Sequence, residues 1–207
     1  MPVLDRLASA LGRNDERPNV ELAVELAASK DRAAIAELAE ALSGGPVATA
    51  NDAIKVLYEI GERNPELVAP HLETFVALLQ SRNNRNVWGA LKAIETVAAQ
   101  QPNETRRHLE AILAAADRGS VIAKDAANGI LVALAANGHA KEALPVLLDR
   151  LAGAAPNQFP TYAEQIATVA TGAHRERLAA IVRTRLPHVA GTAKRVRLEK
   201  LLRKLAK

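Results

Sequence analysis

The 207-residue sequence contains no cysteine and only five aromatic side chains. Without cysteine, disulfides, thiolate metal sites and cysteine nucleophiles are excluded together, and the redox compartment is left open. The scarcity of aromatic residues means that a core must be built mainly from Ala, Leu, Val and Ile. Such a core fits closely packed helices, because small side chains let helix axes approach. The five aromatic residues are Tyr58, Phe75, Trp88, Phe159 and Tyr162.

Long apolar runs and strand-like patterns are also missing. No stretch approaches the roughly 18 uncharged apolar residues of a membrane-spanning helix. The N-terminus carries Asp5 early and lacks a continuous apolar core, which makes it a poor match to a signal peptide. No β-like alternation of useful length occurs. We therefore expect an all-α protein, with the cytoplasm as its default location.

The sequence does have a helical pattern that repeats. Segment 53–60 is followed by Pro65, and 37 residues later the similar segment 90–97 is followed by Pro102. Inward apolar positions step by 37, 37 and 35 residues in the first helix of each repeat. These positions are Leu57, Ile94, Leu131 and Ile166, and their counterparts in the second helices are Phe75, Ile112 and Leu147. A two-helix repeat of this length is typical of an α-solenoid.

We expect one domain over residues 1–207, made of three parts. Residues 1–18 form a cap and connector, with a helix over 3–11 that places Leu11 on its apolar stripe; a mobile arm is the alternative. Residues 19–189 hold about five helix pairs, and residues 190–207 form a basic C-terminal helix. Together these predict a right-handed superhelix with a capping helix at each end.

The ends of several helices can be predicted from local signals. Asn19 is a plausible N-cap of the first repeat helix. The second pair turns at Asn64 and Pro65. Residues 83–86 are expected to form a loop before a third pair that begins at Val87, and the fifth pair is expected to begin near Thr161.

The segment Asn86–Ile94, with the sequence NVWGALKAI, resembles first-helix segments of the adaptin and HEAT superfamily. Over residues 19–189 the chain is similar to HEAT and armadillo-type repeats. This resemblance implies inner helices that line a concave binding face, but no particular function. The HEAT type is favoured over the three-helix armadillo type, because each repeat has room for only two full helices. The turn Asp and second-helix Arg usual in HEAT repeats are not present in every repeat.

Catalytic and metal sites are not indicated. His71 and His108 occupy equivalent places one repeat apart, so they should lie about 8–10 Å apart, and no further regularly spaced ligand accompanies them. The serines fall at helix ends or in the terminal cap, and Gly44 and Gly45 form only a helix stop. We therefore predict no enzyme, no cofactor and no bound metal.

One enzymatic alternative comes from the resemblance. Some HEAT-like proteins resemble DNA glycosylases that use an acidic residue and aromatic walls on a basic concave face. Trp88 and Asp125 would supply fragments of such a site, but aromatic residues are scarce and no motif matches.

Trp88 is the most informative aromatic residue. It aligns with Asn51, Asp125 and Thr161 in the other repeats, and because these are polar, Trp88 should be at least partly exposed. One interpretation is an anchor for a protein partner, since tryptophan dominates many interfaces. The alternative is a ring that packs over a neighbouring helix while its N–H meets water.

The charges are unevenly distributed. From Ala173 onward there are 11 Lys or Arg and two acids, whereas the preceding residues hold 16 basic and 21 acidic side chains. The final helix, 193–207, is amphipathic, which leaves three alternatives: a solubilising cap, a polyanion-binding surface, or an interfacial membrane helix that lacks the usual Trp or Phe. The candidate polyanion-binding residues are Arg175, Arg177, Arg183, Arg185, Lys194, Arg195, Arg197, Lys200, Arg203 and Lys204.

The pattern as a whole favours a non-catalytic scaffold or adaptor. We expect an unidentified protein partner to bind the face made by the second helices. The candidate partner-binding residues are Trp88, Arg106, Arg107, Lys141 and Arg150. The alternative is a module for nucleic acid or another polyanion, centred on the last 35 residues.

Overall fold

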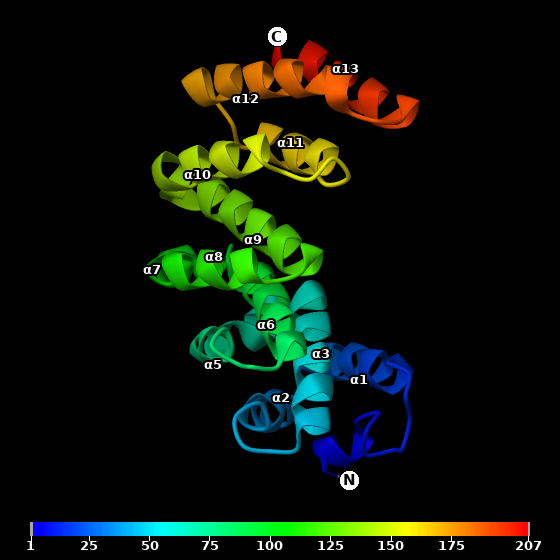
Figure 1. Cartoon of the computed structure of the whole chain (residues 1–207). Coiled ribbons are helices and arrows are strands. Elements are labelled where there is room, and N and C mark those ends of the chain that lie inside the picture. The colour runs from blue at the N-terminus through cyan, green and yellow to red at the C-terminus, as the bar shows by residue number, and fades with distance from the viewer. Residues whose placement is uncertain (1, 207) are drawn as a thin grey trace. The chain divides into compact units, whose positions relative to one another are not determined.

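The computed structural model describes residues 2–206, and every regular element in that range is a helix (Figure 1). The prediction of an all-α helical-repeat fold is confirmed. The chain divides into two compact units, residues 1–127 (unit 1) and 128–207 (unit 2), and the boundary falls inside α9 (Val121–Leu134). The single domain over 1–207 stays a prediction. Among the described residues, no helix combines the length and apolar character needed to cross a membrane.

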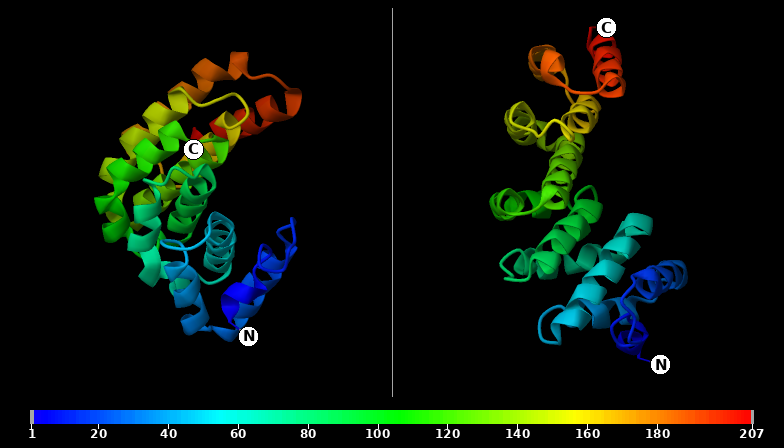
Figure 2. Two further views of the ribbon diagram at one scale, coloured as in Figure 1. Left: turned by 60° about the horizontal axis from the view of Figure 1, so that its bottom comes forward. Right: turned by 45° about the vertical axis from the view of Figure 1, so that its right-hand side comes forward.

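Unit 1 contains two groups of helices. The long helix α3 packs against α1 on one side and α6 on the other, and these three are the first helices of their repeats (Figure 1, and the right view of Figure 2). The second helices α2 and α5 pack against α3 and α6, respectively. The elements are η1 (Val3–Arg6), α1 (Arg17–Ser29), α2 (Arg32–Glu40), α3 (Val47–Arg63), α4 (Pro65–Val68), η2 (Ala69–His71), α5 (Leu72–Leu78), α6 (Asn84–Val97), α7 (Pro102–Arg107) and α8 (Leu109–Arg118).

The inward register predicted from the period is present in the core of unit 1. Leu57 and Ile94, one period apart on α3 and α6, are fully buried. Phe75 and Ile112 are equally buried on the second helices α5 and α8. Each such side chain contributes about 1.5–3 kcal/mol of transfer free energy when it leaves water. The turn after α3 also falls at Asn64, with Pro65 at the first position of α4, as predicted.

Two glycines allow α3 and α6 to approach closely. A Cβ atom built on Gly61 of α3 would lie 2.2 Å from Thr96 Oγ1 of α6. A Cβ atom on Gly89 of α6 would lie 2.9 Å from Ile54 Cγ1 of α3. The two helices therefore interlock at both places, and neither glycine can be enlarged without moving its neighbour.

The N-terminal segment differs from the prediction. Only Val3–Arg6 is helical, as one 3₁₀ turn, and Leu11 is 50% exposed rather than part of an apolar stripe. Asn19 is not an N-cap, because α1 begins at Arg17 and Asn19 is completely buried inside that helix. Its Nδ2 donates to Asp52 Oδ1 of α3 over 2.7 Å, and its Oδ1 accepts from the Ala8 N–H over 2.9 Å.

A third hydrogen bond completes this network. The Ser9 N–H donates to Asp52 Oδ2 over 2.7 Å. Buried polar groups need such partners, because an unpaired one costs several kcal/mol in an apolar surrounding. The network therefore fastens the N-terminal segment to α1 and α3 through polar groups that no apolar pattern reveals.

The prediction of only two full helices per repeat is wrong in two repeats. The second helix of one repeat is divided at Pro70 into α4, η2 and α5, because proline lacks an N–H and clashes with the preceding turn. The next is divided at His108 into α7 and α8. The start of α6 also differs: it begins at Asn84 rather than Val87, and the Asn83 side chain caps it by accepting from the Arg85 N–H.

Unit 2 comprises the end of α9, its partner helix α10, the fifth pair α11 and α12, and the C-terminal helix α13. α10 packs against α11 and α12, and α13 packs against both α11 and α12 (Figure 1). Gly138, with a φ of 96°, adopts the left-handed conformation that the turn before α10 requires. The remaining elements are η3 (Ala135–His139), α10 (Ala140–Ala152), α11 (Phe159–Ala167), α12 (Gly172–Arg185), η4 (Leu186–His188) and α13 (Thr192–Leu205).

The core of unit 2 follows the predicted register. Leu131, Leu147 and Ile166 are fully buried. The fifth pair begins at Phe159, two residues before the predicted Thr161, and the Phe159 ring is fully buried. α11 therefore begins earlier than predicted, because Phe159 packs in the core although the residues before it have the composition of a loop.

Candidate protein-binding surface

One side of α3 and α6 carries polar and aromatic residues instead of core residues. Lys55, Tyr58 and Glu62 recur at helical spacing on α3, and Trp88, Lys92 and Glu95 do so on α6. We call these six residues, with the neighbouring Glu59, the α3–α6 surface. Trp88 and Lys92 lie one period after Asn51 and Lys55, so the two helices present equivalent positions on the same side.

An aromatic pair lies at the centre of this surface. The ring centroids of Tyr58 and Trp88 are 6.0 Å apart and the rings are tilted by 51°. Tyr58 is buried, whereas Trp88 is half-buried. The partial exposure of Trp88 agrees with its alignment to polar residues, and its ring packs over the neighbouring helix. The pair therefore offers an aromatic face to a molecule that approaches α6.

A charged cluster flanks the pair on α3. Lys55 Nζ lies 2.7 Å from Glu59 Oε1, 3.3 Å from Glu16 Oε2 and 4.8 Å from the centroid of the Tyr58 ring. Burial lowers the pKa of Lys55, but hydrogen bonds to Glu59 and Tyr58 outweigh burial and raise the pKa overall. Arg63 extends the cluster with a 2.6 Å ion pair to Glu59. The neighbours of Lys55 therefore favour its charged form.

A second charged cluster lies on the other side, around Lys92. Its Nζ is 2.9 Å from Glu95 Oε2 and 3.5 Å from Glu62 Oε1. Burial raises the pKa of Glu95, with smaller contributions from Glu62 and Asp125, while Lys92 opposes the shift. One lysine therefore pairs with two carboxylates, Glu95 and Glu62, which leaves this group with an excess of negative charge.

A hollow of about 380 Å³ adjoins the first cluster. Arg85 lines it and forms a 2.5 Å ion pair with Glu16, which also contacts Lys55. The buried Nε of Arg85 has no hydrogen-bond partner within the described structure. Other lining residues are Ser9, Arg13, Asn51 and Asp52. The hollow is mostly polar, and it connects the N-terminal segment to the α3–α6 surface.

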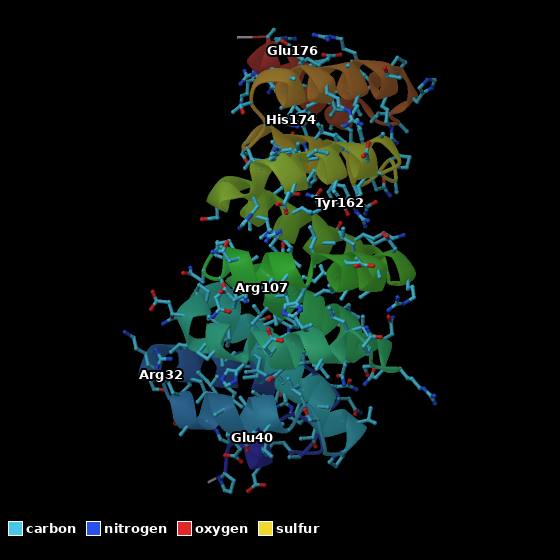
Figure 3. All side chains as sticks on the ribbon, turned by 90° about the vertical axis from the view of Figure 1, so that its left-hand side faces the viewer. Arg32, Glu40, Arg107, Tyr162, His174 and Glu176 are labelled. Carbon is cyan, nitrogen blue, oxygen red and sulfur yellow. The ribbon has the colours of Figure 1, made fainter. Side chains whose placement is uncertain are left out.

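The predicted partner-binding residues come from three helices, α6 and α7 in unit 1 and α10 in unit 2. Trp88 is on α6, whereas Arg106 and Arg107 are on α7, among the second helices, where Figure 3 shows Arg107 on the same side as Arg32 and Glu40 of α2. Both arginines are exposed. Lys141 and Arg150 belong to α10 of unit 2, exposed and half-buried, respectively.

The two histidines of the metal hypothesis have other surroundings. His108 Nε2 lies 2.8 Å from Glu73 Oε1, and burial lowers the pKa of the half-buried His71. Among residues 2–206, no group of three or more potential ligands could hold a metal ion.

Two of the predicted polyanion-binding cations bind backbone carbonyls at helix ends. Arg175 donates from Nε to the Leu205 carbonyl over 3.0 Å and from Nη2 to the Lys204 carbonyl over 2.5 Å, at the end of α13. Arg185 Nη1 donates to the carbonyls of Leu151 and Ala152 at the end of α10. These carbonyls have no partner inside their helices, so the arginines complete the helix ends.

Three further members of this set form side-chain contacts. Arg177 pairs with Asp149 at 2.5 Å, Lys194 donates to Asn157 Oδ1 at 2.6 Å, and Arg197 binds Glu164 with both of its interacting nitrogens. The other five are exposed, and within the described structure they make no side-chain hydrogen bond or ion pair. They are Arg183, Arg195, Lys200, Arg203 and Lys204.

Comparison with solved structures supports the fold. A designed armadillo repeat protein in complex with the peptide (KR)4 has a TM-score of 0.67 and 18% identity, with 98% of each chain covered. A second designed armadillo repeat protein has a TM-score of 0.61 and 17% identity, with 98% of this chain and 99% of that chain covered. The crystal structure of an engineered protein has a TM-score of 0.64 and 16% identity, with 100% and 97% covered.

These likenesses show an armadillo-like helical-repeat fold. The divided second helices at Pro70 and His108 agree with the three-helix armadillo repeat, while membership of the HEAT type stays a prediction. No protein-family model and no curated protein sequence matches the chain.

Proposed function

We propose that this armadillo-like chain is a non-catalytic scaffold that binds an extended segment of a partner protein along the α3–α6 surface. The single observation that carries the proposal is the half-buried Trp88 ring, which packs at a tilt against Tyr58 between two charged clusters. Aromatic side chains at the centre of a surface, surrounded by polar groups, contribute most of the binding energy in many protein interfaces.

The α3–α6 surface is a better candidate than the second helices. Its charged side chains are already held by one another, as in the Lys55–Glu59 and Lys92–Glu95 pairs, so a partner would pay little entropy to order them. Arg106 and Arg107 belong to α7, a second-helix segment, and not to α3 or α6, which carry the aromatic pair. We therefore propose the α3–α6 surface, and not the second helices, as the binding site of the partner.

The charge at the α6 end of the surface points to the chemistry of the partner segment. There, two carboxylates, Glu62 and Glu95, share one cation, Lys92. A segment that carries Lys or Arg beside an aromatic or aliphatic residue would complement both features. The designed armadillo repeat protein in complex with (KR)4 shows that a related fold accommodates a cationic peptide.

The non-catalytic part of the proposal rests on how the ionisable groups of the surface are used. Each lysine is engaged by a carboxylate, and the surface brings together no nucleophile with a base and an orienting acid.

The test selects ligands from a displayed library of random 12-residue peptides on the immobilised full-length protein. We expect selected peptides to be richer in Lys and Arg than in Asp and Glu. We expect Trp88→Ala to weaken their binding by about 30-fold, the loss typical of a central interface residue. Fluorescence polarisation with the labelled peptides measures the loss.

Arg107→Ala on α7 is the matched control and should change affinity less than about threefold, since it lies on the other layer. Because Trp88 packs on Tyr58, circular dichroism and thermal unfolding must show that Trp88→Ala is folded. Glu62→Gln, at a side chain 44% exposed, tests the same surface without removing any packing. Peptides that bind Trp88→Ala normally but fail on Arg107→Ala would overturn the proposal, as would a library that yields no ligand.

A further inference from the structure

Unit 2 carries a positive charge that the proposed peptide-binding surface does not use. Residues 128–207 contain 13 Lys or Arg and five acids, whereas residues 1–127 contain 14 and 18. Helix α13 holds much of this charge, and Glu199 is its only acid. Five of the ten predicted polyanion-binding cations form hydrogen bonds or ion pairs within unit 2. A ligand would therefore bind mainly to the other five.

The available cations share one side of α13. Leu198 and Leu201 are buried and face the rest of unit 2. Arg195, Lys200, Arg203 and Lys204 are all exposed on the side of the helix turned away from those leucines. We call these four residues the basic face. Cations on α13 that lie nearer to neighbouring elements, Lys194 and Arg197, bind Asn157 and Glu164 instead.

We propose that the basic face of α13 binds the phosphate backbone of double-stranded nucleic acid without reading its bases. The proposal concerns a different surface and a different ligand from the proposed peptide binding, and neither depends on the other.

Charge density favours a duplex as the ligand. With a rise of 1.5 Å per residue, the basic face extends about 14 Å along α13. A duplex carries one negative charge per roughly 1.7 Å of its axis, so a segment of that length presents on the order of eight phosphate charges to four cations. Each cation therefore finds a phosphate with little adjustment, and the contacts need no particular sequence.

The side chains of the basic face are less suited to a membrane. Binding at a lipid interface usually requires large apolar or aromatic side chains that enter the headgroup region beside the cations. The exposed side of α13 offers only Val196, which is 40% exposed. Leu198 and Leu201 are buried and Leu202 and Leu205 are partly buried, so the apolar face of α13 is directed into its own fold.

The experiment measures the anisotropy of a fluorescein-labelled 30-base-pair duplex of random sequence against the full-length protein. With four phosphate contacts the affinity should fall on the order of 100-fold between 50 and 200 mM salt. Replacing all four residues of the basic face with Gln should weaken binding at 50 mM salt by more than about 10-fold.

The control variant removes the same charge elsewhere. Arg32, Arg82, Arg118 and Lys124 are four exposed cations of unit 1, and their replacement with Gln lowers the net charge equally. This variant should retain duplex binding within about threefold. Both sets are exposed, and thermal unfolding of each variant should match that of the parent chain.

Three outcomes would overturn the proposal. The first is no duplex binding by the parent chain at 50 mM salt, and the second is equal loss in both quadruple variants. The third is tighter binding to vesicles containing 30% phosphatidylserine, or to polyglutamate, than to duplex at matched charge concentration. Trp88→Ala should leave duplex binding unchanged, which separates this result from the peptide test.

Discussion

His71 lies where η2 joins α5, and its imidazole is half-buried. Burial lowers the pKa of His71 below its usual value near 6.5, and the charge of Glu40 offsets this only in part. The unfolded chain therefore takes up a proton at His71 more readily than the folded chain does. Stability from this residue is present above about pH 6.5 and is lost as the pH falls toward the lowered pKa.

We predict that His71→Gln makes the free energy of unfolding less sensitive to acid. Between pH 7.5 and pH 5.0 the free energy of unfolding of the parent should fall by more than that of the variant. Only the parent gains a proton at residue 71 when it unfolds at the lower pH. Urea unfolding at the two pH values measures it. His188→Gln, at an exposed position of η4, is the control and should leave the parent's pH dependence unchanged. Parallel curves for His71→Gln and the parent would contradict the assignment.

Single residues also mark the limit of what the sequence predicts. The burial of Leu57, Ile94 and Ile166 follows from spacing alone, because the hydrophobic effect acts on every apolar side chain at an inward position. Asn19 could not be placed in this way. Its buried bonds to Ala8 and Asp52 depend on two segments far away in the chain, and the same residue type is a common N-cap.

At the scale of elements, the α3–α6 crossing depends on the two glycines described above. Alanine normally stabilises a helix interior by about 1 kcal/mol relative to glycine. At Gly61 the added Cβ would lie 2.2 Å from Thr96 Oγ1 and 2.9 Å from Thr96 Cβ, so the Thr96 side chain or the helix that carries it must shift. Overpacking of a core contact typically costs about 1–3 kcal/mol.

We therefore predict that Gly61→Ala lowers the free energy of unfolding by about 1–3 kcal/mol despite its better helix propensity. Urea unfolding measures the change. The double variant Gly61→Ala with Thr96→Ala should recover part of the loss, because it removes the hydroxyl nearest the new methyl group. Gly44→Ala, where no atom lies within 4 Å of the added carbon, is the control. A stabilised Gly61→Ala protein would show that the helices move apart at no cost.

Element ends were predictable where a single strong signal existed. The turn at Asn64 and Pro65 was found because proline occupies the first position of α4. The break at Pro70 does not follow from the apolar pattern, because Leu67, Val68 and Leu72 keep a helical spacing across it. Proline inside a helix costs about 3 kcal/mol, so Pro70 was itself the signal. The sequence contains no comparable signal for the break at His108.

The candidate surface was predictable only in part. Trp88 was identified because its equivalents in other repeats are polar. The same comparison could have found Lys55 and Lys92, which are one period apart and four residues after Asn51 and Trp88, respectively. The roles of the arginines could not be found in this way. Arg185 and Arg203 look alike in sequence, but one binds the end of α10 and the other is exposed.

At the scale of the whole molecule, stability should be local, because each helix of a repeat protein packs mainly on its neighbours. We predict that Gly61→Ala and Arg185→Lys act on different parts of the chain. Gly61→Ala should speed amide hydrogen exchange in α3 and α6. Arg185→Lys should speed it in α10 and α11, because lysine cannot bind both carbonyls of α10 while its charge stays 4.3 Å above the Phe159 ring.

Hydrogen exchange followed by mass spectrometry of peptic fragments measures both patterns. Lys124→Gln, at an exposed position of α9, serves as the control and should change neither. If Gly61→Ala and Arg185→Lys each raised exchange uniformly over residues 2–206, the chain would unfold as one cooperative body and the prediction would be wrong.

The equivalent turns before Pro65 and Pro102 have a consequence for how such a chain can change its length. Asn64 and Gln101 both precede a proline and have similar backbone angles, with φ of −148° and −128° and ψ of 82° and 61°. Deleting residues 65–101 would join Asn64 directly to Pro102 and keep an asparagine-to-proline junction of the same kind. One repeat could therefore be deleted or inserted at this junction with the existing turn sequence.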